Sequence, residues 1–319
     1  MNILVTGGAG YIGSHFCKYA SSQGHQVVTF DNLSTGHREF VKFGPLEEGD
    51  LSDSNRIQEV LNKYEIEAVV HFAAKAIIAE SFVEKNLYWE NNVEGTRSLL
   101  WAMSMAGVSK ILFSSSCTTY GVSDAPYLSE EHPQNPINPY GETKKACEEM
   151  VIDFQEGLPG AKAGILRYFN VIGCEEDGSL WENHEPETHL IPNLLKAANK
   201  GEVVSIFGDQ YNTRDGTCVR DYIDVRDLAE IHLAALDQIE EQNMFISNIG
   251  LGRGYSILEI KDIMEDLLEV SIESQIEEAR EGDPPRLVAD VQFFKSWYSR
   301  DLRSVREGIM SMKQSQKYT

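Results

Sequence analysis

A glycine-rich segment near the start of the chain, TGGAGYIG at residues 6–13, restricts the possible folds most strongly. It follows a short apolar run, Ile3–Thr6, and precedes a stretch with helical periodicity. Glycine lets backbone N–H groups approach a pyrophosphate closely, and the N-terminus of the following helix adds partial positive charge. The spacing of Gly7, Gly10 and Gly13 therefore predicts the phosphate-binding turn of a dinucleotide site.

Asp31 lies at the end of the second predicted strand, 18 residues after Gly13. A carboxylate at this place can accept hydrogen bonds from the 2′-hydroxyl of a ribose, and it disfavours a 2′-phosphate. The sequence therefore predicts NAD rather than NADP as the cofactor. Arg38 could recognise a 2′-phosphate instead, so NADP stays the alternative.

Short runs rich in β-branched residues alternate with longer helical stretches through the first half of the chain. Such alternation predicts βαβ units, and therefore an α/β fold with a doubly wound parallel sheet of the Rossmann type. The predicted strands are Ile3–Thr6, Val27–Asp31, Ala68–Phe72, Lys110–Ser114 and Ala163–Tyr168, and the predicted helices lie near residues 12–23, 54–63, 90–106 and 141–156.

The rhythm of strands and helices becomes less regular after residue 172. We expect a dinucleotide-binding domain over residues 1–172 and a smaller C-terminal substrate-binding lobe over residues 173–319. Residues 222–250 again have the pattern of a strand followed by a helix, so we expect this segment to return to the main sheet.

The chain carries 28 Lys and Arg against 50 Asp and Glu, which gives a formal net charge of −22. This charge repels polyanions and anionic lipid surfaces, so nucleic-acid and membrane partners are not expected. An anionic nucleotide substrate would need a local group of Arg side chains and backbone N–H groups.

The five cysteines are odd in number, lie far apart and include no C-x-x-C pair. Reduced thiols and a cytoplasmic location are therefore expected, and no metal site is predicted. No apolar run approaches the roughly 18 residues of a membrane span, and the first predicted strand begins too early to leave room for a signal peptide.

Tyr140 and Lys144 stand four residues apart at the start of a predicted helix, so their side chains share one face. An ammonium group beside a phenol lowers the pKa of the phenol and lets tyrosine act as a base near neutral pH. Ser116 lies at the C-terminal end of the fourth strand, on the side of an open α/β sheet where ligands bind. These three residues predict a catalytic site in which the Ser116 hydroxyl bonds the reacting oxygen, whereas Ser114 and Ser115 are assigned structural roles.

These residues lie within a longer series of matching segments. The chain resembles the extended short-chain dehydrogenase/reductase family, and within it most closely the UDP-glucose 4-epimerases, along nearly its full length. The matching segments are TGGAGYIGSH at 6–15, DNLSTGHRE at 31–39, EGDLSD at 48–53, HFAAKAIIAES at 71–81, NNVEGT at 91–96, SSSCTTYG at 114–121, RYFNVIG at 167–173, HLIPN at 189–193, DGTCVRDYIDVRDLA at 215–229 and REGDPPRLVAD at 280–290.

The resemblance implies an NAD-dependent isomerase that interconverts UDP-glucose and UDP-galactose by transient oxidation at sugar carbon C4, with tightly bound NAD and no net redox change. It assigns catalysis to Ser116, Tyr140 and Lys144. It also implies a homodimer formed through the helices near residues 90–106 and 141–156.

The same resemblance assigns the ligand contacts. Cofactor contacts fall on Gly7, Gly10, Tyr11, Ile12, Gly13, Asp31, Asn32, Asp50, Leu51, Phe72, Ala73, Ala74, Asn91, Tyr140, Lys144 and Phe169. Contacts to the UDP-sugar substrate fall on Ser116, Asn170, Leu190, Arg220, Tyr222, Arg280 and Asp283. The two arginines supply the local positive charge that a diphosphate requires.

Departures from the family pattern leave alternatives open. Lys75 stands one place earlier than the corresponding lysine of epimerases that have the segment G-L-K-A, which puts its cofactor contact in doubt. Leu287 occupies the family's gate to the sugar pocket, where tyrosine favours unacetylated sugars and a small residue admits N-acetyl groups. Epimerases of UDP-N-acetylhexosamines or UDP-pentoses therefore stay alternatives.

The sequence gives less support to two functions other than that of an epimerase. A sugar-nucleotide dehydratase needs an acid–base pair directly after Ser116, and Cys117 and Thr118 stand there instead. A non-catalytic NAD-binding scaffold is the least expected, because such a protein has no reason to keep Tyr140 and Lys144 in register.

Overall fold

The computed structural model describes residues 1–315 and Tyr318. Its contacts divide the chain into two compact units that interleave along the sequence. Unit 1 comprises Met1–Thr119, Asn138–Arg167 and Leu228–Ser247, and unit 2 comprises Tyr120–Ile137, Tyr168–Asp227 and Asn248–Thr319. The domain boundary that the sequence predicts at residue 172 stays a prediction.

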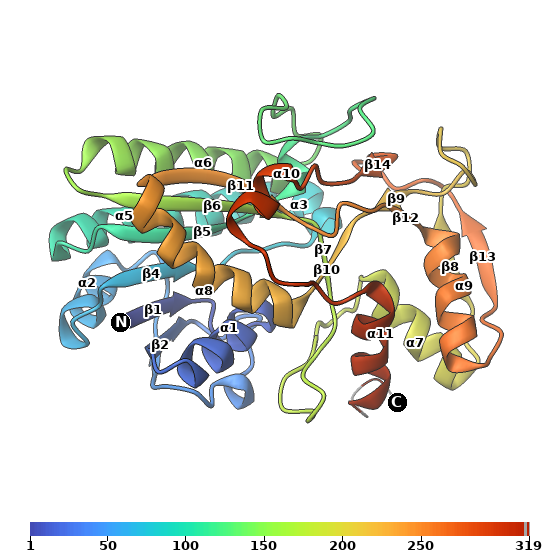
Figure 1. Ribbon diagram of the computed structural model, residues 1–319, viewed down its shortest axis with the longest axis horizontal. Helices are drawn as coiled ribbons and strands as arrows, with labels where there is room; N and C mark the ends of the chain where they lie inside the picture. Colours follow the sequence, from blue (N-terminus) through green and yellow to red (C-terminus); the bar gives the residue numbers. More distant parts are fainter. Residues whose placement is uncertain (316–317, 319) are drawn as a thin grey trace. The chain divides into compact units, whose positions relative to one another are not determined.

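A seven-stranded sheet forms the centre of unit 1 (Figure 1), in the order β11-β6-β5-β4-β1-β2-β3. The pairs β1–β2, β1–β4, β2–β3 and β4–β5 are parallel. The order reverses between β1 and β4, as in a doubly wound sheet, so the prediction of a Rossmann-type α/β fold is confirmed. The strands are β1 (Asn2–Thr6), β2 (Gln26–Asp31), β3 (Leu46–Glu48), β4 (Ala68–His71), β5 (Lys110–Ser116), β6 (Lys162–Tyr168) and β11 (Met244–Ile249).

Helices pack on both faces of this sheet. The long helices of unit 1 are α1 (Tyr11–Ser22), α2 (Ser54–Lys63), α5 (Gly95–Ala106), α6 (Pro139–Gly157) and α8 (Val225–Gln242), the last beginning in unit 2. Apolar side chains of α2, α5 and α6 share one core with the strands, including Leu61, Leu99 and Val151. On the other face, Phe16 of α1 contacts His232 of α8.

Several short elements precede α5 and α6, and the sequence did not predict them as such. They are the 3-10 helices η1 (Arg38–Phe40) and η3 (Cys117–Thr119), the α-helices α3 (Ile78–Val83) and α4 (Lys85–Tyr88), and the π-helix η2 (Trp89–Glu94). The helix predicted near residues 90–106 therefore begins as a π-helix, and its regular α-helical part starts at Gly95.

Helix α6 is fixed at its start and along its buried face. The Asn138 side chain accepts a hydrogen bond from the Gly141 N–H at 2.8 Å and caps the helix, and Pro139 occupies its first turn. Further along, the Glu148 carboxylate receives hydrogen bonds from the Arg167 guanidinium of β6 at 2.6–3.1 Å and a short one from the Ser115 hydroxyl of β5. This network ties α6 to two neighbouring strands.

Unit 2 contains three small sheets. Two of them have two strands each: β7 (Asn170–Ile172) with β10 (Tyr222–Asp224), and β8 (Val204–Phe207) with β13 (Ser274–Glu277). The third has three strands in the order β12 (Tyr255–Ser256), β9 (Val219–Arg220) and β14 (Arg286–Leu287). Its helices are α7 (Leu190–Lys200), α9 (Ile257–Leu268), α10 (Gln292–Trp297) and α11 (Val305–Gln314). Of the segment 222–250, which was expected to return to the main sheet, β11 does so, whereas β10 pairs with β7.

Asp221 organises the strands of unit 2 from a fully buried position. Its carboxylate accepts hydrogen bonds from the backbone N–H groups of Tyr222, Leu251, Gly252 and Ala289 at 2.7–3.1 Å. Burial nevertheless raises the pKa of this carboxyl to about 6, because these four hydrogen bonds only partly replace the lost hydration.

All five cysteines are free thiols with buried side chains. Among the described residues, no helix is both long enough and apolar enough to cross a membrane.

Replacing Arg167 with Met should cost about 3–5 kcal/mol of the free energy of unfolding, because the buried Glu148 carboxylate would lose its cation. The double variant E148L/R167M leaves neither charge buried and should lose less. Urea unfolding at pH 7, followed by circular dichroism, measures both. A double variant at least as destabilised as the single one would contradict the role given to the charge pair.

Candidate active site

The glycine-rich turn lies between β1 and α1, where the sequence predicted it. Gly7 has φ +72°, and its carbonyl accepts the Gly10 N–H at 3.0 Å. A Cβ on Gly13 would lie 2.3 Å from the Gly7 carbonyl oxygen, and one on Gly7 would lie 2.6 Å from the Ala73 nitrogen. The turn therefore closes this tightly only with glycine, and it places Tyr11 and Ile12 in the first turn of α1.

Asp31 ends β2 beside this turn and is nearly buried. Its carboxylate accepts hydrogen bonds from the N–H groups of Ala9 at 3.0 Å and Leu33 at 2.8 Å. Burial raises the pKa of the carboxyl, and the two hydrogen bonds oppose that rise. Because an ionised carboxylate has about four acceptor positions, Asp31 can still accept hydroxyl groups of a ligand.

The other predicted cofactor residues of unit 1 follow neighbouring strands. Phe72 follows β4, and its N–H donates to the Thr6 carbonyl at 3.0 Å, with Ala73 and Ala74 next along the chain. Asn32 follows β2 and Asp50 follows β3, and the Asn32 amide donates a hydrogen bond to the Asp50 carboxylate at 2.7 Å. Leu51, the next residue after Asp50, is buried. Asn91 lies in the π-helix, where its amide donates to the Asn92 side chain at 2.9 Å.

These positions share one edge of the sheet. Gly7, Asp31, Phe72 and Ser116 each lie at or just after the carboxyl end of β1, β2, β4 or β5. In a parallel sheet these ends lie at the same edge, and ligands of open α/β folds bind there at the point where the strand order reverses.

Ser116 is the last residue of β5, so this strand is two residues longer than predicted. Its hydroxyl oxygen accepts hydrogen bonds from the Thr118 N–H at 3.2 Å and the Thr118 hydroxyl at 3.0 Å. Because a serine hydroxyl has one proton to donate, these two bonds leave that proton for another acceptor. The hydroxyls of Ser114 and Ser115 contact His232 and Glu148 instead, in agreement with their assigned structural roles.

Tyr140 and Lys144 lie one turn apart on α6, and both side chains are more than nine-tenths buried. The Lys144 Nζ donates to the Ser114 carbonyl oxygen of β5 at 2.8 Å. It lies 4.8 Å from the centre of the Phe113 ring and 6.0 Å from the centre of the Tyr140 ring. The structure therefore brings the predicted phenol and ammonium group together beside β5.

Burial lowers the pKa of Lys144 to about 8, and the nearby Cys147 and Glu148 oppose this shift. The ammonium form still predominates at neutral pH. A positive charge held in a dry environment attracts negative charge on a neighbouring oxygen more strongly than it would in water.

Three supporting residues escaped the sequence analysis. Thr118 orients the Ser116 hydroxyl, and Glu148 anchors α6. Tyr88 is fully buried, with its ring 6.5 Å from the Tyr140 ring at 85°, and its hydroxyl bonds the Ile77 backbone at 2.6–2.9 Å. Of the three, only Glu148 could have been identified from the sequence, because it lies four residues after Lys144 on the same helical face.

The predicted substrate residues Asn170, Leu190, Arg220, Tyr222, Arg280 and Asp283 all lie in unit 2, as does the predicted cofactor residue Phe169. The Arg220 guanidinium donates to the Val219 and Pro284 carbonyls at 3.0 and 2.7 Å and to the Asp283 carboxylate at 3.1 Å. Leu287 is paired with Arg220 in the β9–β14 register and is buried. Arg220, Asp283 and Leu287 thus form one group.

The remaining predicted substrate residues are more dispersed within unit 2. Asn170 pairs with Tyr222 in the β7–β10 register. Tyr222 is buried, which raises the pKa of its phenol. Leu190 opens α7, and the exposed Arg280 packs its guanidinium 3.7 Å from the centre of the Phe207 ring.

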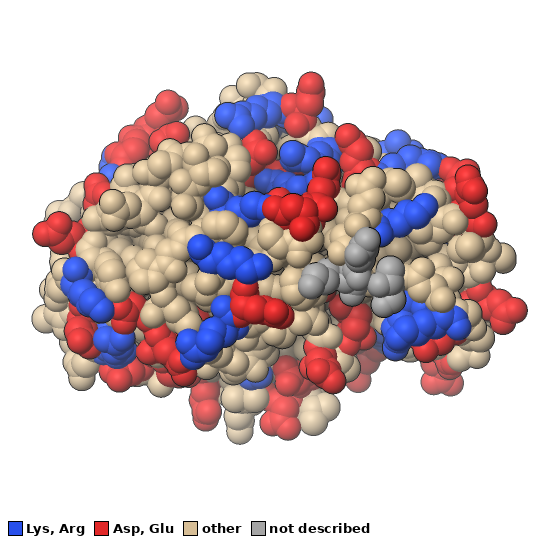
Figure 2. Space-filling view, turned by 90° about the horizontal axis from the view of Figure 1, so that it is seen from below, with Lys and Arg blue, Asp and Glu red and all other residues tan. Residues whose placement is uncertain are grey.

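Acidic and basic side chains are interspersed over the face drawn in Figure 2. The drawn face therefore offers no continuous basic surface to a long polyanion. Individual side chains such as Arg220 and Arg280 are candidates to supply positive charge to a small anion.

Comparison with known proteins agrees with this arrangement. The profile of the "NAD dependent epimerase/dehydratase family" matches residues 3–250. A UDP-glucose 4-epimerase of Rhizobium meliloti (strain 1021) is 47% identical over 292 residues, which are 91% of this chain and 88% of that protein. The crystal structure of UDP-glucose 4-epimerase from Brucella ovis in complex with NAD is 44% identical, with a TM-score of 0.91 over 97% of this chain and 96% of that one. The structure of UDP-glucose 4-epimerase from Bifidobacterium longum in complex with NAD⁺ and UDP is 32% identical, with a TM-score of 0.93 over 99% and 97% of the two chains.

Replacing Lys144 with Met should raise the free energy of unfolding of the ligand-free protein at pH 7, although the residue is assigned to catalysis. The fall in its pKa from 10.5 to about 8 corresponds to a cost of about 3 kcal/mol for burying the charge, which the lost hydrogen bond to Ser114 offsets in part. We expect a net gain of about 1–3 kcal/mol in urea unfolding.

The same variant tests the pH dependence. Between about pH 8 and 10.5 the unfolded chain binds the Lys144 proton more tightly than the folded chain does, so the wild-type free energy of unfolding should rise with pH there. The K144M variant should lack this rise. A variant less stable than the wild type at pH 7, with an unchanged pH profile, would show that the buried charge carries no such cost.

Proposed function

The chain belongs to the NAD dependent epimerase/dehydratase family, and on this premise we propose that it interconverts UDP-glucose and UDP-galactose by transient oxidation at sugar carbon C4. The observation that carries the proposal is the buried pair of Tyr140 and Lys144 on α6, with Nζ 6.0 Å from the phenol ring centre. Relatives named UDP-glucose 4-epimerase, two of them solved with NAD and one also with UDP, support the choice of cofactor and substrate.

The residues of unit 1 fit NAD. Gly7, Gly10 and Gly13 form a tight turn in which a Cβ on Gly13 would clash with the Gly7 carbonyl. This turn leads directly into the N-terminus of α1, which suits a diphosphate. The Asp31 carboxylate at the end of β2 suits ribose hydroxyls. When bound there, NAD supplies an acceptor for the hydride of C4 and returns that hydride later.

Tyr140 acts as the base of the proposed reaction. Its phenolate oxygen takes the proton of the sugar 4-hydroxyl while the C4 hydrogen leaves as hydride, so the carbon loses two electrons and becomes a ketone. The buried ammonium of Lys144 stabilises the phenolate by direct charge attraction. The same phenol later returns its proton to the reduced oxygen.

Ser116 holds the reacting oxygen. Because its own oxygen already accepts two hydrogen bonds from Thr118, its proton is directed toward another acceptor, and the developing oxyanion of C4 provides one. The ketone sugar then turns about its bond to the diphosphate and presents its other face, and the returning hydride inverts the configuration.

Unit 2 holds the uridine diphosphate in this proposal. Asp283 and the Val219 and Pro284 carbonyls fix the orientation of the Arg220 guanidinium, and guanidinium forks match diphosphate oxygens. Arg280 would supply a second positive charge. An anchored diphosphate lets the sugar rotate without leaving the protein.

The sugar preference rests on Leu287, which is buried in β14 next to Arg220 in the register. A buried leucine leaves less room than a small residue and more than tyrosine, so UDP-N-acetylhexosamine and UDP-pentose substrates are the alternatives. The ratio of kcat/KM for UDP-galactose to that for each alternative UDP-sugar decides among them.

We also propose a homodimer formed through the helices near residues 90–106 and 141–156, which include α5 and α6, and a cytoplasmic location. Large apolar side chains are exposed on α5, including Trp101 at 46% and Met105 at 57%. Covering such side chains with a second copy would remove apolar surface from water. Five buried free thiols support a reducing compartment.

Replacing Tyr140 with Phe should reduce kcat for UDP-galactose by about 10²–10⁴-fold, because the proton acceptor is lost while the ring is kept. The NAD content of the purified variant, measured after acid release, should match the wild type. Tyr127→Phe is the matched control, since Tyr127 is 52% exposed and should leave kcat unchanged. Undiminished turnover in Y140F would refute the assignment of Tyr140 as the base.

A further inference from the structure

A cluster of four side chains in unit 2 has no role assigned to it in the proposed reaction. Glu182, His184, Glu187 and His189 each offer one carboxylate oxygen or imidazole nitrogen, and these four atoms lie within 4.8 Å of one another. The residues occupy the loop before α7 and the N-cap position of that helix. The sequence analysis predicted no metal site here.

The spacing of the four atoms resembles the first coordination sphere of a metal ion. The Glu182 Oε1 lies 3.3 Å from the His184 Nδ1 and 2.5 Å from the His189 Nδ1, and the Glu187 Oε1 lies 3.5 Å from the His189 Nδ1. Two ligand atoms that are each about 2.0–2.2 Å from one zinc ion at a tetrahedral angle are about 3.3 Å apart. Two of the three distances match this spacing, whereas the Glu182 and His189 atoms form a direct ion pair and would have to move apart by about 0.8 Å for four-coordinate binding.

The cluster brings two carboxylates together. The Glu182 side chain is 2% exposed, and Glu187 is only 21% exposed. These two carboxylates stand beside two imidazoles, and a divalent cation held by all four side chains would balance both carboxylate charges. The N-terminus of α7 adds partial positive charge, which opposes a cation only modestly against two carboxylates.

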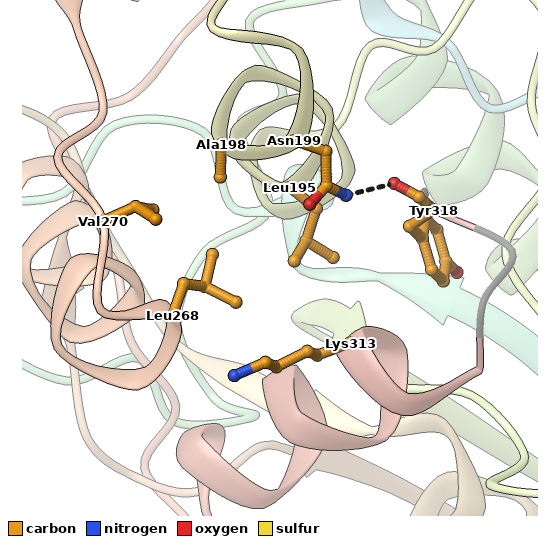
Figure 3. Close-up of a pocket in the computed structure, with 7 residues that line it drawn as sticks. All are labelled: Leu195, Ala198, Asn199, Leu268, Val270, Lys313 and Tyr318. Atoms are coloured by element: carbon orange, nitrogen blue, oxygen red, sulfur yellow. Dashed lines mark hydrogen bonds between the residues drawn. The ribbon is translucent and has the colours of Figure 1, made fainter.

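The backbone around the cluster is held in place. The Tyr318 hydroxyl accepts the Glu182 N–H at 2.9 Å, and the Tyr318 carbonyl accepts the Asn199 amide at 2.8 Å. Figure 3 shows this second bond beside a cavity of about 250 Å³ that is also lined by Leu195 and Lys313. Tyr318 thus connects the loop that carries Glu182 to the far end of α7.

We propose that Glu182, His184, Glu187 and His189 bind one divalent transition-metal ion, with zinc the best match to two imidazoles and two carboxylates. The ion is structural, because four protein ligands leave no open position for chemistry. It fastens the loop over residues 182–187 to the start of α7. The ion takes no part in the chemistry of the proposed epimerase reaction, although His189 directly precedes Leu190, which is assigned to substrate binding.

The test uses the untagged, full-length protein, stripped with EDTA, dialysed and then incubated with zinc chloride. Plasma mass spectrometry after desalting should find one zinc ion per chain, and the thermal midpoint should rise with zinc and fall again with EDTA. Cobalt(II) in place of zinc should give the visible absorption bands of a tetrahedral complex.

The double variant H184Q/H189Q and the single variant E187Q identify the ligands. Each should lower zinc affinity by at least about tenfold. E187Q removes a partly exposed carboxylate and should fold normally, which keeps the test valid if the double variant does not fold. His25→Gln in unit 1 is the control and should bind zinc like the wild type.

Two outcomes would overturn the proposal. One is a wild-type protein that retains no stoichiometric zinc and shows no thermal shift, which would mean that hydrogen bonds and ion pairs among these side chains suffice. The other is zinc binding that is unchanged in E187Q and in the double variant, which would place the ion elsewhere.

Discussion

The buried ammonium group of Lys144 is the constraint on which the proposed chemistry of this protein depends. A charge that is 4% exposed is costly, and the protein keeps it by a hydrogen bond to the Ser114 carbonyl and by the face of the Phe113 ring. That arrangement fixes the distance between α6 and β5. The phenol of Tyr140 and the hydroxyl of Ser116 are carried by the same two elements, so their relative positions follow from it.

The fold places Lys144 and its neighbours near the other residues of the candidate site. The parallel order of the strands brings the ends of β1, β2, β4 and β5 to one edge, where the glycine turn and Asp31 also lie. The buried ion pair of Glu148 and Arg167 holds the next turn of α6 against β6. Burial of Lys144 lowers stability but serves the proposed catalysis, because its charge is held by a backbone carbonyl. Glu148 serves both, because its carboxylate is paired with the Arg167 guanidinium.

Patterns among neighbouring residues predict much of the fold and of the candidate site from the sequence. The glycine spacing, the acid at the end of the second strand and the four-residue separation of Tyr140 and Lys144 each depend on a few neighbouring residues. The extra length of β5, the π-helix before α5 and the pairing of β10 with β7 depend on contacts between distant segments, and no local pattern reports them. Tyr88 and Thr118 were missed for the same reason, because an aromatic or a hydroxyl residue has many roles and only its neighbours show which one it plays. The cluster of Glu182, His184, Glu187 and His189 was overlooked because its spacing matches no common metal motif.

The central claim is that the hydrogen on C4 moves as a hydride within the protein while Tyr140 handles only the hydroxyl proton. Conversion of UDP-galactose to UDP-glucose in D₂O, with the product analysed by NMR and mass spectrometry, tests it most directly. The account predicts product with no deuterium at C4, because that hydrogen never exchanges with solvent. Deuterium at C4 in proportion to turnover would contradict it, since it would show that the carbon loses a proton rather than a hydride.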